Sequence, residues 1–288
     1  MQVATVSNFE TKKSSLNIKE SLASLVANSA LAVAPAVVSV PVINKISNIG
    51  KKLSKDEVVA MNNAAQKILE NTGLKKLGVE IVDMSNIFNM TGMPVKLAEI
   101  LNPIIGASRG KNAFFTPKNI FGVIDANKIG INTEKLPNAL FHEIGHALNY
   151  NKGKIFKVMQ KLRTPGMILA SLLAIFPALT KNTKAKEGQE LSKAQKIKNG
   201  VRDKAGLLAF GAMVPMLLEE AVASVKGCKL AKGVLSKDLF KKVAKTNAVA
   251  YVSYLATAVG IGIAAWGTRK VKDKLVERKE AKLQQAQK

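Results

Sequence analysis

Long apolar runs separated by polar stretches divide the chain. The first run lies at 22–43, carries no charge, has lysines on both sides and contains Pro35 and Pro41. Its length predicts a signal anchor or a membrane-associated segment at 21–44, preceded by a disordered N-terminus at 1–20. The prolines oppose a single straight helix, and a packed segment of a soluble protein is the alternative.

The other apolar runs lie in the second half of the chain. Those at 165–179 and 205–218 are joined by a polar, basic connection and predict a helical hairpin at 165–230. The uncharged run at 246–267 has aromatic residues near its ends and basic residues directly after it, which is typical of a transmembrane helix. We expect a charged, solvated tail at 268–288. Core helices of a soluble protein are the alternative interpretation of the same runs.

The stretch between the first and second runs mixes helix and strand patterns. Ser54 followed by Asp56 and Glu57 is typical of a helix start, and apolar residues at helical spacing continue to Gly73. Short alternating segments then predict strands at 79–82, 112–116, 119–124 and 128–132. With the helical second half of the chain, these strands predict an α+β fold.

The amino-acid composition indicates which class of partner the protein binds. The chain has 44 Lys and Arg against 20 Asp and Glu, a formal charge of +24, and 47% of its residues are hydrophobic. This combination favours an anionic lipid membrane. We expect no nucleic-acid partner, because only 5% of the residues are aromatic and the basic segments lack interleaved stacking rings. A single cysteine excludes a disulfide-stapled scaffold.

The only two histidines of the chain lie four residues apart, in the segment His142-Glu143-Ile144-Gly145-His146. On a helix, positions i and i+4 share a face, so both imidazoles can bind one Zn²⁺. Glu143 then faces a zinc-activated water as its general base. The alternative is an ordinary core helix on which two histidines find separate partners.

A catalytic zinc needs a third protein ligand, and the chain has no further histidine. The acidic pair Glu219 and Glu220 directly follows fourteen apolar residues. Burying charge there is costly unless the carboxylates bind something, so we expect this pair to supply the ligand. The alternative is that the pair lies at the water interface and merely ends a membrane helix.

These residues resemble those of the gluzincin metallopeptidases. The order HExxH, apolar helix, polar loop, apolar helix, Glu-x-x-Ala over about 136–229 is similar to the integral-membrane HtpX-like and CAAX-prenyl-protease-like branch. The resemblance implies a zincin-like catalytic region over 54–164, with a small sheet before the HExxH helix, followed by mostly helical, membrane-type segments. It also implies Glu220 as the third ligand, with Glu219 as the fallback, and Ser224 stands where that branch has aspartate.

The expected function is therefore that of a membrane-associated zinc metalloendopeptidase acting on a protein or peptide substrate. Two alternatives remain: a non-catalytic zinc-binding membrane scaffold, and a soluble zincin whose apolar runs are core helices. Because the segments flanking the later apolar runs are all basic, the sequence leaves open which side of the membrane the active site faces.

Two further parts of a peptidase site can be sought in the sequence. The strand at 129–132 lies where zincins place the cleft-edge strand to which a substrate adds by main-chain hydrogen bonds, although an ordinary sheet strand explains it equally well. The donor that stabilises the oxyanion stays open among several side chains. They are Tyr150, Tyr251, Tyr254 and an arginine such as Arg202.

Overall fold

A computed structural model describes residues 44–85, 103–119, 124–185 and 188–286. The chain forms two compact units. Among these described residues, the sheet unit takes in those of 44–163 and 215–255, and the helical unit those of 164–214 and 256–286. The segments predicted at 1–20 and 21–44 fall outside the described residues, apart from residue 44, as does most of the strand predicted at 119–124.

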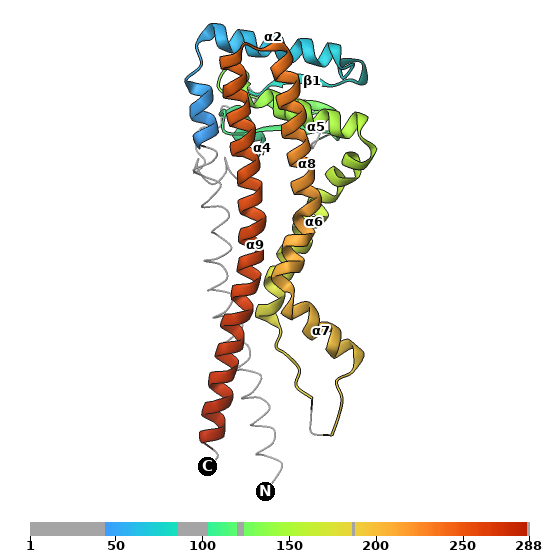
Figure 1. The fold of residues 1–288 in the computed structure, drawn as a ribbon, viewed down its shortest axis with the longest axis vertical. Coiled ribbons are helices and arrows are strands. Elements are labelled where there is room, and N and C mark those ends of the chain that lie inside the picture. The colour runs from blue at the N-terminus through green and yellow to red at the C-terminus, as the bar shows by residue number, and fades with distance from the viewer. Residues whose placement is uncertain (1–43, 86–102, 120–123, 186–187, 287–288) are drawn as a thin grey trace. The chain divides into compact units, whose positions relative to one another are not determined.

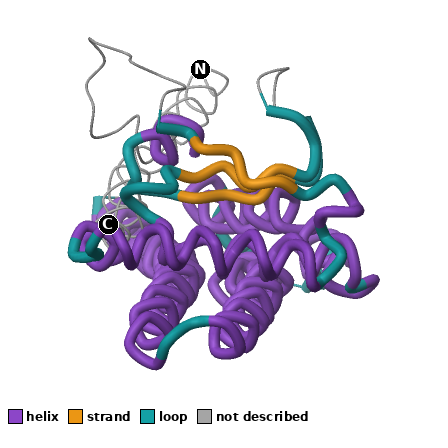
Figure 2. The backbone as a smooth tube through the Cα atoms, turned by 90° about the horizontal axis from the view of Figure 1, so that it is seen from above, coloured by secondary structure: helices purple, strands orange, loops and turns teal. Residues whose placement is uncertain are grey.

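The sheet unit contains three short strands, β1 (Glu80–Asp83), β2 (Ala113–Thr116) and β3 (Lys128–Ile131). Their order is β1-β3-β2, with β1 parallel and β2 antiparallel to β3 (Figure 2). Strand β3 is thus the central strand, and both of its edges are already paired. The expectation that residues 129–132 offer a free edge to a substrate is therefore wrong.

Helix α2 (Lys55–Asn71) begins as its sequence predicts. The Ser54 hydroxyl accepts a hydrogen bond from the Glu57 backbone N–H, and the Glu57 carboxylate accepts one from the Ser54 N–H, which is a capping box. Lys242 also donates to Glu57, at 2.6 Å, and these hydrogen bonds hold the pKa of the Glu57 carboxyl below its usual value. The helix start therefore ties α2 to a residue far along the chain.

Helix α5 (Leu140–Lys152), which carries both histidines, follows the 3-10 turn η2 (Pro137–Ala139), where proline occupies the first position. Its Leu140 and Ile144 pack in one core with Ile129 of β3 and Met61 of α2. The shorter elements of the unit are η1 (Lys75–Leu77) and α4 (Pro103–Ser108). The α+β prediction is confirmed, since a small sheet precedes the histidine helix and helices follow it.

Three helices of the described residues are long and apolar enough to cross a membrane: α6 (Lys154–Leu179), α8 (Ala205–Val234) and α9 (Lys237–Gln285) (Figure 1). A short helix, α7 (Lys193–Asp203), lies between α6 and α8 in the sequence. The long helices extend well beyond the apolar runs, and α6 continues through two prolines. The expected tail at 268–288 continues α9 as helix to Gln285.

Helices α5 and α8 approach each other at the level of their backbones. A Cβ atom added at Gly145 would lie 2.1 Å from the backbone oxygen of Ala223, and one at Gly227 would lie 2.3 Å from that of Phe141. Glycine is therefore required on both helices for this close contact. The contact brings the histidine motif directly against the segment that contains the acidic pair.

We expect Gly145→Ala to push these two helices apart and to lower the free energy of unfolding by about 1–3 kcal/mol, because a backbone oxygen cannot move aside as a side chain can. The matched control is Gly233→Ala in α8, where an added Cβ meets nothing within 4 Å. Alanine favours a helix over glycine, so the control is expected to be neutral or slightly stabilising. Thermal unfolding in one detergent compares the variants, and equal melting temperatures would contradict the expectation.

Candidate metal centre

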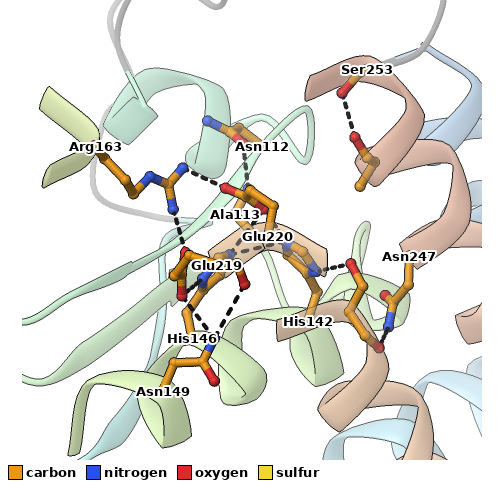
Figure 3. Close-up of polar contacts among 12 residues, drawn as sticks. Asn112, Ala113, His142, His146, Asn149, Arg163, Glu219, Glu220, Asn247 and Ser253 are labelled. Atoms are coloured by element: carbon orange, nitrogen blue, oxygen red, sulfur yellow. Dashed lines mark hydrogen bonds and ion pairs between the residues drawn. The ribbon is translucent and has the colours of Figure 1, made fainter. Parts of the chain in front are cut away.

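Helix α5 presents His142, Glu143 and His146 together in a buried position. Their exposed fractions are 5%, 6% and 4%. The two rings meet edge to face with centroids 4.5 Å apart, and their Nε2 atoms are 3.0 Å apart (Figure 3). The i, i+4 spacing thus places two imidazole nitrogens at one point, as the helical pattern requires.

Helix α8 brings Glu220 to the same point. Its side chain is fully buried, and its Oε2 lies 3.1 Å from Nε2 of His142 and 3.3 Å from Nε2 of His146. Two nitrogens and one carboxylate oxygen therefore form a small triangle of ligand atoms. Among the described residues, two overlapping groups of side chains could hold a metal ion: His142, Glu143 and His146, and His146, Glu219 and Glu220.

Glu219, also fully buried, contacts the other side of the His146 ring. Its Oε1 lies 2.8 Å from Nδ1 of His146 and accepts a hydrogen bond of 2.9 Å from Nδ2 of Asn149. Asn149 also donates to the Glu219 backbone oxygen and accepts from Lys226 at 2.7 Å. Glu219 is thus held at Nδ1 of the ring, whereas Glu220 faces Nε2.

Ser224 makes the equivalent contact to the other histidine. Its Oγ lies 3.2 Å from Nδ1 of His142, and its backbone oxygen accepts a hydrogen bond of 3.2 Å from Asn247 of α9. Ser224 therefore orients His142. The integral-membrane gluzincin branch that the sequence resembles has an aspartate at the position of this serine. Both imidazoles are held through Nδ1, which leaves both Nε2 atoms directed toward Glu220 (Figure 3).

Arg163 of α6 joins the two carboxylates. Its guanidinium lies 2.5 Å from Oε1 of Glu220 and 3.3 Å from Oε2 of Glu219, and it stacks 5.8 Å from the ring centroid of Tyr254. Our sequence analysis did not find this residue. Only five of the 44 basic residues of the chain are arginines. Arginine suits paired carboxylates better than lysine does, so an arginine just before an apolar run is the signal in the sequence that could have identified it.

The charges around His146 favour a positive charge at the centre of the cluster. Burial of the ring lowers the pKa of His146, but the carboxylates of Glu220 and Glu219 outweigh this effect and raise the pKa to about 10. The same carboxylates would attract a cation in place of the proton.

The four side chains that the sequence offers as oxyanion donors lie in different surroundings. Tyr254 is in contact with Arg163, beside the acidic pair. Tyr150 packs against Phe115, with the ammonium group of Lys157 over its ring. Arg202 belongs to the helical unit, where it forms an ion pair of 2.7 Å with Asp273. Tyr251 makes no such ring contact with the residues that the structure describes.

In comparisons with known proteins, no family model, no curated protein and no solved structure matches this chain. The likeness to gluzincins is carried by the spacing of His142, Glu143 and His146 and by the nearby glutamates.

Proposed function

We propose that the protein is a membrane-integrated zinc metalloendopeptidase. The observation that carries the proposal is the triangle formed by Nε2 of His142, Nε2 of His146 and Oε2 of Glu220, with sides of 3.0, 3.3 and 3.1 Å. In a tetrahedral zinc site with bonds of about 2.0–2.1 Å, two ligand atoms are about 3.3 Å apart. The three atoms therefore fit three corners of a zinc tetrahedron with little adjustment.

Zinc also fits the chemistry of the donors. Two imidazoles and one carboxylate are the ligand set of a catalytic zinc with an open fourth position. In this assignment Glu220 is the third ligand. Glu219 contacts His146 at Nδ1, and Ser224 does the same for His142, so each neutral ring would present its Nε2 to a bound zinc ion.

A bound Zn²⁺ would supply a Lewis acid that polarises a substrate carbonyl and lowers the pKa of a water molecule. Glu143 stands beside the ligands on the same helix and accepts the proton of the attacking water, then returns it to the leaving amine nitrogen. The guanidinium of Arg163, next to Glu220, and the hydroxyl of Tyr254 are the donors we assign to the oxyanion.

The membrane location is supported by outward-facing apolar side chains on the long helices. Ile168 and Leu172 of α6 are 56% and 60% exposed, and Val252 of α9 is 57% exposed. A soluble protein would leave such rows in contact with water, whereas lipid would cover them. This observation favours the membrane enzyme over the soluble zincin.

Cleavage of a peptide library or of casein by the purified protein in detergent tests the proposed activity. We expect cleavage, its loss on treatment with a zinc chelator, and its recovery with Zn²⁺ but not with Mg²⁺, because imidazole ligands suit zinc. Cleavage that resists chelation would contradict the zinc mechanism. One zinc per chain without cleavage of any substrate would instead support the non-catalytic scaffold.

A further inference from the structure

The helical unit contains an apolar pocket, and none of the residues that line it belongs to the metal centre. It has a volume of 360 Å³ and is lined by Gly206 and Leu207 of α8 and by Gly262, Ile263 and Trp266 of α9. A Cβ atom at Gly206 would lie 2.7 Å from the Gly262 backbone oxygen, so the helices touch at the glycines. Leu207 and Trp266 are 71% and 55% exposed, which opens the pocket outward.

The rim of this pocket is positively charged. Lys204, between the end of α7 and the start of α8, lines the pocket, and the Lys270 ammonium lies 5.9 Å from the ring centroid of Trp266. In the described part of the chain neither lysine pairs with an acidic side chain. The one acidic residue of the lining, Asp203, lies 3.5 Å from the guanidinium of Arg269, which offsets its charge.

We propose that this pocket binds one anionic phospholipid. One of its two acyl chains lies along the surface made by Gly206, Gly262 and Trp266, the other stays in the surrounding lipid, and the phosphate lies between Lys204 and Lys270. The volume is at the small end of the range for ligand sites, about 300–1,000 Å³, which suits a single hydrocarbon chain.

Each part of the pocket matches one part of such a lipid. Lysines near a membrane surface attract anionic headgroups, and tryptophan is enriched at the boundary between headgroups and hydrocarbon. Free phosphate would use the lysines but leave the apolar surface uncovered. The inference rests on the membrane location in the proposed function and is independent of the metal centre.

The chain offers a direct probe, because Trp266 is its only tryptophan. The full-length protein is reconstituted in vesicles of phosphatidylcholine and phosphatidylglycerol at one fixed composition, with bromine on the chains of one lipid or the other. Bromine quenches indole fluorescence on contact. We expect stronger quenching from brominated phosphatidylglycerol than from the same mole fraction of brominated phosphatidylcholine.

Two double variants test the lysines. Lys204→Ala with Lys270→Ala is expected to weaken the preference for phosphatidylglycerol by roughly fivefold for each lysine removed. Lys274→Ala with Lys282→Ala removes the same charge from exposed positions further along α9 and is expected to leave the preference unchanged. Each variant is compared as the ratio of its fluorescence with and without bromine, because Lys270 itself affects Trp266.

Three results would overturn the proposal. Equal quenching by the two lipids would leave Trp266 in the membrane but without an anionic site. Equal loss of preference in both double variants would reduce the effect to overall charge. Weak quenching by either lipid would mean that another segment, such as the apolar run at 22–43, covers Trp266, or that the membrane location is wrong. Peptidase activity and zinc content are separate measurements, which none of these results would change.

Discussion

Glu143→Gln is expected to lower the hydrolysis rate by about 10³-fold or more while the protein keeps its metal. Glutamine has nearly the same shape as glutamate but cannot take a proton from water, and general base catalysis contributes about 10²–10⁴-fold in enzymes. The three proposed ligand atoms belong to His142, His146 and Glu220 and are not altered by the substitution. Peptide cleavage rates and zinc content per chain, measured on the same preparation, check the prediction.

The matched control is Glu134→Gln, which makes the same chemical change at an exposed residue shortly before α5, the helix that carries both histidines. It is expected to cleave at the wild-type rate. Hydrolysis by the Glu143→Gln variant at a comparable rate would remove Glu143 from the mechanism.

The second prediction distinguishes the roles of the adjacent residues Glu219 and Glu220 in zinc binding. Glu220→Gln is expected to lose zinc almost completely, because it removes the only anionic ligand. Glu219→Gln is expected to weaken zinc binding by about 10–100-fold, the usual loss for a residue that orients a ligand. Both side chains are fully buried and both contact Arg163, so the two variants suffer similar structural cost. Competition with a chromogenic chelator measures both affinities.

Circular dichroism of both variants serves as the control for folding. If the order were reversed, with Glu219→Gln losing the metal and Glu220→Gln retaining it, Glu219 would be the ligand and the assignment of the triangle would fail.

The local parts of the site follow directly from the sequence. The i, i+4 spacing of His142 and His146 fixes their common face on any helix. Ser54 and Glu57 fix a helix start in the same way, because a capping box needs only neighbouring residues. A charged pair after an apolar run signals a partner because burying bare charge is costly, and both glutamates do have partners in the structure.

The sequence could not separate Glu219 from Glu220, because the choice depends on packing. Adjacent helical residues point about 100° apart, so one is expected to face the histidines. In the structure both do, since Glu220 meets the Nε2 side and Glu219 the Nδ1 side of the same His146 ring. The close contact at Gly145 allows this arrangement.

Other features depend on contacts between distant parts of the chain. Strand order is set by pairing across many residues, so an alternating pattern at 128–132 cannot reveal that β3 lies between β1 and β2. Arg163 joins the site only through the path of α6. The apolar run of that helix starts at Pro165, yet the helix itself begins at Lys154 and continues through this proline. A proline signals a helix boundary in the sequence, although membrane-type helices often contain one.

The claim that two imidazoles and one carboxylate of this chain hold a single zinc is tested most directly by X-ray absorption at the zinc edge on the purified protein. The account predicts one zinc per chain with four nitrogen or oxygen ligands at about 2.0–2.1 Å and the outer scattering of two imidazole rings. A sulfur ligand from Cys228, the one cysteine of the chain, would contradict it. The signal of a single imidazole ring would contradict it as well.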